Sequence, residues 1–106
     1  MSVVRINAIT VDPEKAPALE ERFARRAGEV SGMEGFEGFE LLRPTDGRDV
    51  YLVLTWWRSD ADFQRWVESE EFQRGHREAR SGPPVASASE LWSYDVVERE
   101  GPGRSA

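Results

Sequence analysis

Few residues of this chain could bind a ligand or take part in chemistry, and Asn7, Trp66 and His76 are the main candidates. His76 is the only histidine in the sequence. One imidazole cannot form a metal site built from several histidines. It can complete the coordination of haem iron, because the porphyrin already supplies the other nitrogen ligands. The alternative is a histidine at the surface without a functional role.

Trp66 and Asn7 each allow a functional and a structural interpretation. Trp66 precedes His76 by ten residues, and its indole could press on a flat ligand or pack in the core beside Phe63. Asn7 lies within an apolar, β-branched segment, where asparagine is disfavoured. If its amide faces the core, it needs a hydrogen-bond partner, which can be a ligand, a backbone group or water.

Arg22 and Arg26 are four residues apart and therefore share one face of a predicted helix. Together they could donate hydrogen bonds to carboxylates such as the propionates of haem. Glu21 and Arg25 lie beside them in the sequence, so a solvated, charged helix face is the other interpretation.

Alternating or continuous apolar residues predict the strands that must position these side chains. Each segment is rich in β-branched or aromatic types, which favour strands. The segments cover residues 3–11, 36–43, 50–57 and 87–97. In the first of them, Asn7 is predicted on the face opposite Ile6 and Ala8.

Two helices are predicted between these strands. The first spans about residues 13–31, with Asp12 as its N-cap, Pro13 in its first turn and an apolar stripe along one side. The second begins at a capping box in residues 59–62 and contains Trp66. Ser69 offers a second N-cap, which predicts that this helix breaks or bends there.

The resulting order, β-α-β-β-α-β, is typical of an α+β sandwich of the ferredoxin-like type. The strand of residues 50–57 (VYLVLTWW) is apolar on both faces. Because one layer of helices covers only one face of a sheet, we expect a second copy of the chain to cover the other. Residues 1–98 are predicted to form one domain, and residues 99–106 a disordered tail.

Composition and charge exclude several classes of protein. The sequence has 106 residues, no cysteine and a formal net charge of -6. Disulfides, thiolate metal sites and cysteine nucleophiles are therefore excluded, and the acidic balance argues against general nucleic-acid binding. No apolar segment of membrane-spanning length and no signal-peptide pattern are found, so we expect a cytoplasmic protein that binds neither nucleic acid nor membranes.

The motifs resemble those of the IsdG/MhuD-type haem-degrading monooxygenases, within the broader antibiotic biosynthesis monooxygenase (ABM) group of dimeric ferredoxin-like proteins. The similarity covers almost the whole chain. It is carried by Asn7, by His76, and by the blocks VVRINAITV, LEERFARRA, FELLRP and Ser59 to Trp66. These blocks resemble the MhuD branch, whereas the interval from Trp66 to His76 resembles the IsdG branch, which leaves the type of product open.

The resemblance implies a dimeric α+β barrel in which haem is both the substrate and the group that activates O2, with electrons from an external donor. His76 would be the axial iron ligand, Asn7 would donate a hydrogen bond on the distal side, and Trp66 would favour ruffling of the macrocycle. The products would be a linear tetrapyrrole and iron. Further pocket residues implied by the resemblance are Arg22, Phe23, Arg26, Val53 and Phe63.

Two other functions fit the same residues. One is a cofactor-independent monooxygenase of a polycyclic aromatic substrate, for which an axial histidine is not required. The other is a haem-binding or storage dimer without turnover, because a fold alone does not imply chemistry. The position of the sole histidine, His76, favours the haem enzyme.

Overall fold

The computed structural model describes residues 2–26, 28–69, 72–75, 77 and 85–101. These residues form, in order, β1 (Val3–Val11), α1 (Ala16–Arg25), β2 (Phe36–Leu42), β3 (Val50–Trp57), α2 (Asp60–Val67) and β4 (Ala86–Asp95). Residues 72–75 add one helical turn after α2. No helix in this described part is long and apolar enough to cross a membrane.

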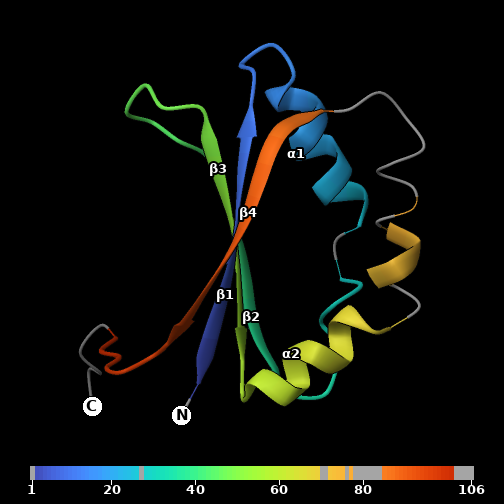
Figure 1. The fold of residues 1–106 in the computed structure, drawn as a ribbon, viewed down its shortest axis with the longest axis vertical. Coiled ribbons are helices and arrows are strands. Elements are labelled where there is room, and N and C mark those ends of the chain that lie inside the picture. The colour runs from blue at the N-terminus through green and yellow to red at the C-terminus, as the bar shows by residue number, and fades with distance from the viewer. Residues whose placement is uncertain (1, 27, 70–71, 76, 78–84, 102–106) are drawn as a thin grey trace.

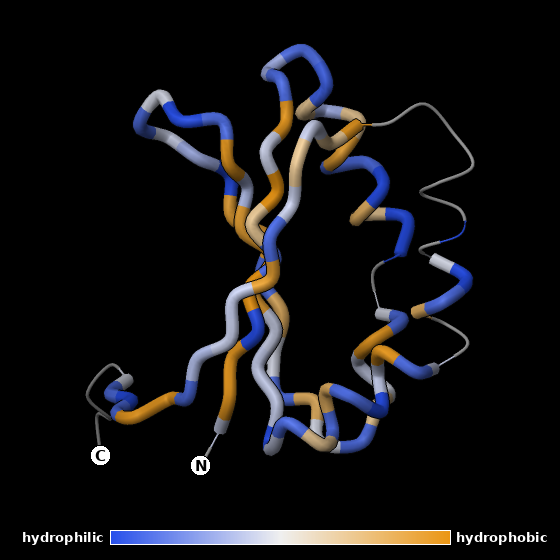
Figure 2. The backbone as a smooth tube through the Cα atoms, viewed as in Figure 1, coloured by the Kyte–Doolittle hydropathy of each residue, from blue (hydrophilic) through white to orange (hydrophobic). Residues whose placement is uncertain are grey.

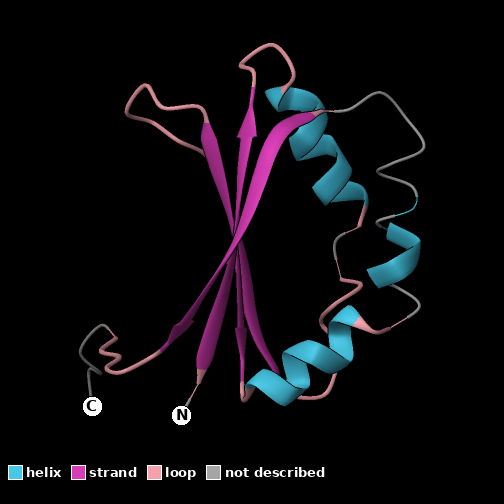
Figure 3. Cartoon of the chain, in the orientation of Figure 1, coloured by secondary structure: helices cyan, strands magenta, loops and turns pink. Residues whose placement is uncertain are grey.

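The described strands pair antiparallel in the order β2-β3-β1-β4. Both helices and the turn of residues 72–75 lie on one side of this sheet, as Figure 1 and Figure 3 show. The predicted ferredoxin-like α+β architecture is therefore confirmed. The start of β1 and the end of β4 lie at the same end of the sheet, because the two strands run antiparallel side by side.

The helix-facing side of the sheet carries two separate hydrophobic clusters. The first lies under α1 and is built on the buried residues Ile9, Val11, Leu19, Tyr51 and Val53. The second lies beside α2 and is built on the buried residues Val3, Trp57 and Phe63. In Figure 2, hydrophobic segments run along the strands, whereas the loops at the upper end of the sheet are hydrophilic.

The first helix begins later than the sequence predicts. α1 starts at Ala16, with Lys15 rather than Asp12 as its N-cap and with Pro17 in its first turn. Proline has no backbone N–H, so in a helix that began at residue 13 it would interrupt the hydrogen bonds of the second turn. In the first turn that donor is not needed, and this is where Pro17 lies.

The same helix also ends earlier than predicted, at Arg25. Gly28 follows with a φ of +92°, in the left-handed region that commonly terminates a helix. Val30, which the sequence places on the apolar stripe of the helix, lies in the turn beyond it. It still packs against the second cluster. The prediction that Val30 faces the core is therefore confirmed, whereas the prediction that it belongs to the helix is wrong.

The beginning and end of α2 confirm the predictions. Ser59 is the N-cap, and its hydroxyl oxygen accepts a hydrogen bond from the backbone N–H of Asp62 at 3.3 Å. α2 ends at Val67, and the Ser69 hydroxyl caps the next turn by accepting from the N–H of Phe72 at 3.1 Å. Trp66 and residues 72–75 therefore belong to two separate helical segments.

The strand predictions lie close to the structure. β1 and β3 have the predicted bounds, β2 ends one residue earlier, and β4 spans Ala86–Asp95 instead of residues 87–97. The predicted extent of the domain, residues 1–98, stays a prediction. Of the predicted tail, residues 99–101 carry no helix or strand, and residues 102–106 lie outside the described part of the chain.

Asp62 ties the start of α2 to neighbouring segments. Its buried carboxylate accepts hydrogen bonds from Arg58 at 3.0 Å, from the Ser59 hydroxyl at 2.8 Å and from Arg65 at 2.6 Å. Gly35, with a φ of +81°, lies so close that a methyl group there would overlap this carboxylate. The hydrogen bonds, led by that of Arg58, lower the pKa of Asp62 to about 2.

We predict that Asp62→Asn destabilises the fold at neutral pH and that its deficit shrinks in acid. Because the pKa of Asp62 is lowered in the folded state, its contribution is present above the unfolded pKa of about 4 and is lost as the pH falls towards 2. Urea unfolding at neutral and acidic pH measures the difference. Glu34→Gln is the control, because Glu34 also pairs with Arg58, at 3.4 Å, but is 69% exposed. A deficit of the Asp62 variant that stays constant into acid would contradict this role.

Candidate functional site

Asn7 lies in the middle of β1, with its side chain on the helix-facing side of the sheet. The register places it opposite Val53 on β3 and Leu91 on β4. Its neighbours on the same face of β1 are Arg5 and Ile9, as the alternation of the sequence predicts. The row from Val53 through Asn7 to Leu91 therefore crosses the sheet at the point where the candidate site was expected.

Asn7 also separates the two hydrophobic clusters. Ile9 and Val53 belong to the first cluster, and Val3 belongs to the second. Between them, β1 presents only Arg5 and Asn7 to the helices. The candidate site thus has two polar residues, Arg5 and Asn7, with apolar residues on either side of them along the sheet. This composition is typical of the floor of a small-molecule site.

The amide of Asn7 is half-buried and has no hydrogen-bond partner among the residues that the structure describes. Its amide atoms are not among the fully buried side-chain atoms that lack a partner in the described part of the chain, so water can reach them. The sequence left open three possible partners for this amide: a ligand, a backbone group or water. The structure rules out the backbone of every described residue. Water and a polar atom of a ligand stay open as the partners of the Asn7 amide.

Trp66 is half-buried on α2 and packs against the second cluster. Its ring meets that of Phe72 edge-on, with the ring centroids 5.5 Å apart and an interplanar angle of 83°. Ser69 strengthens the connection, because its hydroxyl donates to the carbonyl of Trp66 at 2.7 Å while it caps the following turn. Trp66 is thus both a core residue and the anchor of the turn of residues 72–75.

His76 lies outside the described residues, and its predicted role as an iron ligand stays a prediction. Its neighbours in the chain are described: Gly75 belongs to the helical turn after α2, and Arg77 is exposed. Figure 1 shows this turn between α1 and α2 along the helix layer. Among the residues that are described, no group of three or more histidines and carboxylates could hold a metal ion.

Arg22 and Arg26 are half-buried at the C-terminal end of α1, where positive charge interacts favourably with the helix dipole. Arg26 donates to Glu29 at 2.6 Å, and its guanidinium lies against Gly75. The structure therefore brings Arg26 next to the segment that carries His76 in the sequence. The contacts of both arginines with a ligand stay predictions.

The other predicted pocket residues, Phe23, Val53 and Phe63, contribute to the two clusters. Val53 is 9% exposed and Phe63 is 8% exposed. Phe23 packs against the first cluster and lies 6.1 Å from Phe39 between ring centroids. These residues are distributed on both sides of Asn7, and their contact with a ligand also stays a prediction.

Two residues beside Asn7, Arg5 and Leu91, are absent from the site residues that the sequence predicts. Leu91 is 59% exposed although it lies on the helix-facing side of β4. Arg5 is only 8% exposed; it donates to Asp60 at 2.6 Å and lies 5.6 Å from the ring centroid of Phe63. Alternation along β1 could have identified Arg5, whereas Leu91 is identified only by the pairing of β1 with β4.

A charged cluster holds α1 on the sheet. Glu20 accepts hydrogen bonds from Arg43, at 2.8 and 2.5 Å, and from the hydroxyl of Tyr51. These bonds, led by that of Arg43, lower the pKa of Glu20 to about 2, whereas burial and then Glu20 raise the pKa of Tyr51. Both groups therefore keep one protonation state near neutral pH, which suits a structural role rather than proton transfer.

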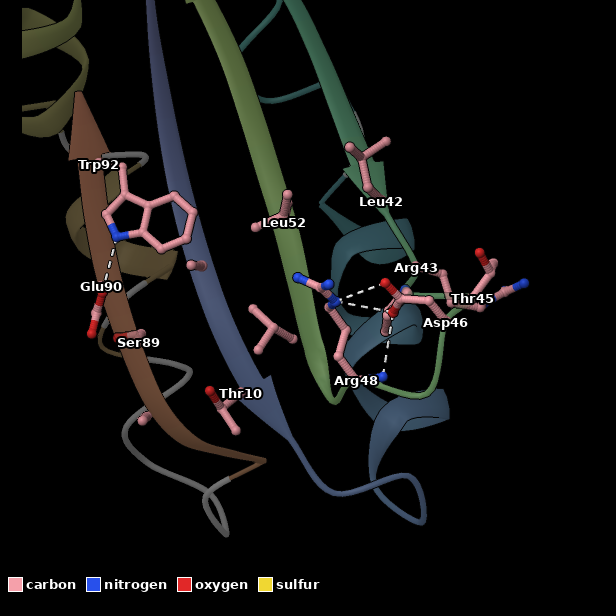
Figure 4. Close-up of a pocket in the computed structure, with 14 residues that line it drawn as sticks. Thr10, Leu42, Arg43, Thr45, Asp46, Arg48, Leu52, Ser89, Glu90 and Trp92 are labelled. Atoms are coloured by element: carbon pink, nitrogen blue, oxygen red, sulfur yellow. Dashed lines mark hydrogen bonds and ion pairs between the residues drawn. The ribbon is translucent and has the colours of Figure 1, made fainter. Parts of the chain in front are cut away.

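The opposite face of the sheet carries a hollow of about 600 Å3, shown in Figure 4. Leu52 and Trp92 line it from the strands, and Arg43 and Arg48 line it from the loop between β2 and β3. The indole N–H of Trp92 donates to Glu90 at 2.9 Å. Because none of the predicted site residues lines this hollow, it is distinct from the candidate site.

Comparison with known proteins agrees with this arrangement. The family model described as antibiotic biosynthesis monooxygenase matches residues 2–78. A relative from Mycobacterium tuberculosis, named heme oxygenase (mycobilin-producing), is 43% identical over 109 aligned residues and covers 100% of both chains. A relative from Staphylococcus haemolyticus, named heme oxygenase (staphylobilin-producing), is 30% identical and covers 76% of this chain and 84% of its own.

A solved structure of MhuD from Mycobacterium tuberculosis, described with two hemes bound in its active site, is also similar. It has a TM-score of 0.77 and 40% identity, covering 93% of this chain and 99% of that chain. The resemblance in the sequence motifs is therefore confirmed by both sequence and structure. The chain belongs to the antibiotic biosynthesis monooxygenase family and, within it, to the IsdG/MhuD-type haem-degrading monooxygenases.

Proposed function

We propose that this chain binds haem on the helix-facing side of its sheet and opens the porphyrin ring with O2, releasing iron and a linear tetrapyrrole. The observation that supports this most directly is the half-buried amide of Asn7, which lacks a partner among the described residues. Its apolar surroundings fit a large, flat substrate that needs few polar contacts. The names of the two haem oxygenases reported above support the same substrate.

Bound haem would supply the metal that activates O2, with electrons from an external donor. The residues of the chain would hold and orient the ring. His76 would be the axial ligand, next in sequence to a turn that Ser69 and Trp66 fix to α2. Asn7 would donate its amide N–H to a polar atom near the reacting centre, where a preorganised donor is effective.

The remaining residues would shape the substrate. Trp66 would press on the ring and keep it ruffled, and its own position is fixed by the second cluster and by Phe72. Arg22 and Arg26 would donate to the haem carboxylates from the end of α1. This local positive charge is required because the chain as a whole carries a formal net charge of -6, which repels an anionic substrate.

His76→Ala is expected to abolish tight haem binding, because iron would lose its protein ligand. The dissociation constant should rise at least about a hundredfold, measured as the Soret absorbance during titration with haemin. Arg77→Ala changes the exposed neighbour of His76 and should bind normally, which makes it the matched control. Stoichiometric binding with an unchanged spectrum in the His76 variant would show that this residue is not the ligand.

Asn7→Ala is expected to retain haem and to lose turnover by about a hundredfold, because one preorganised donor would be missing. The decay of the Soret band in air, with ascorbate as reductant and catalase present, measures the rate. Ser93→Ala, on β4 opposite Arg5, is the control for a change on the same face of the sheet. A normal rate of haem loss in the Asn7 variant would refute the assigned role.

We also propose that two copies of the chain pack through the sheet face opposite the helices. This outer face carries the large, exposed side chains Leu42 (40%), Trp92 (37%) and Tyr94 (52%). The half-buried Leu52, Leu54 and Trp56 of β3 share this face, and exposed apolar surface on a protein is typical of an interaction site. The hollow of Figure 4 lies on the same face, where a second copy would cover it.

Leu52→Glu is expected to give a monomer, because it places a charge in the middle of the proposed interface. Leu52 lies on the outer face, paired with Ala8 and Leu42. Sedimentation velocity of the wild-type chain and the variant measures the change. Ala18→Glu adds the same charge to an exposed position of α1 and should remain a dimer. A wild-type chain that sediments as a monomer would exclude the interface.

A further inference from the structure

Arg26 connects the end of α1 to the helical turn of residues 72–75. Its guanidinium lies so close to Gly75 that a methyl group on this glycine would overlap guanidinium atoms. The missing side chain at Gly75 therefore creates the space that Arg26 occupies. Glycine is a poor helix former, so its place in this turn is explained by the close approach that it permits.

Glu29 holds Arg26 in this position. The guanidinium donates to a carboxylate oxygen of Glu29 at 2.6 Å, and the Arg26 side chain is only 28% exposed. At the other end of the same turn, Phe72 packs against Trp66. The turn thus contacts α2 through its first residue and Arg26, just after α1, through its last.

We propose that Arg26 is a positioning residue, which fixes the turn of residues 72–75 to α1 through the backbone of Gly75. This turn immediately precedes His76 in the chain, so the contact restrains the point from which that residue extends. The role is separate from a contact between Arg26 and haem carboxylates. The consequence of this positioning role for haem ligation rests on the proposed function. The contact between Arg26 and Gly75 does not.

Gly75→Ala tests the contact in the haem-free protein, because two effects of opposite sign can be separated. Alanine strengthens the helical turn, which alone should slow its amide hydrogen exchange by about fourfold. In the presence of Arg26, however, the added methyl group must displace the guanidinium. Exchange of the peptide that covers residues 72–75 is therefore compared in the wild type, Gly75→Ala, Arg26→Gln and the double variant.

In the Arg26→Gln background, we expect Gly75→Ala to slow the exchange of this peptide. When Arg26 is present, we expect the same substitution to slow exchange at least about threefold less, or to accelerate it. Equal effects of alanine in the two backgrounds, within threefold, would overturn the proposal. Gly32→Ala is the control for a glycine change without a neighbour, because nothing lies within 4 Å of a methyl group at that position.

A second comparison separates positioning from carboxylate binding. Titration with haemin and with its dimethyl ester, which has no free carboxylates, is carried out on Arg26→Gln and Arg22→Gln. A residue that only pairs with carboxylates should affect haemin alone, whereas Arg26→Gln should still weaken binding of the ester at least about threefold. Equal affinity of the wild type and Arg26→Gln for the ester would overturn the positioning role in haem binding.

The two experiments fail in different ways. If the wild-type chain takes up neither porphyrin, the proposed function is wrong. The exchange comparison needs no porphyrin, so it decides whether Arg26 restrains the turn in either case.

Discussion

Asn7 places a half-buried polar amide in the middle of the helix-facing side of the sheet, and the rest of the candidate site is arranged around it. Among the described residues, this side of the sheet does not form one continuous core. Instead, Val53 and its neighbours pack under α1, and Trp57 with Phe63 packs beside α2. The amide is left between the two clusters, where a ligand with an apolar body and a polar centre can meet it.

A core divided in this way requires that each helix be held separately. Glu20, bonded to Arg43 and Tyr51, holds α1, and the buried Asp62 holds the start of α2. The turn of residues 72–75 then joins the two helices through Phe72 and Gly75. The candidate site is thus assembled from elements that are each fixed by their own contacts, and Asn7 takes part in none of these contacts.

Local patterns predicted most of the secondary structure, because strands, caps and turns depend on neighbouring residues. Alternation placed Asn7 on the correct face, and Ser59 and Ser69 marked both ends of the α2 region. Pro17 and Gly28 are the local signals that shorten the first helix, and in the structure they outweigh its apolar stripe. Leu91 beside Asn7 and the contact between Arg26 and Gly75 depend on pairing between distant segments, which no local pattern contains.

Titration of the purified chain with haemin, followed by ascorbate in air with catalase present, tests most directly whether the site around Asn7 degrades haem. A saturable Soret band that decays after addition of ascorbate and leaves a bilin-like spectrum is the predicted result. A saturable band that persists would make the protein a haem binder without turnover. The absence of any band would contradict haem as the substrate and favour an aromatic substrate that requires no axial histidine.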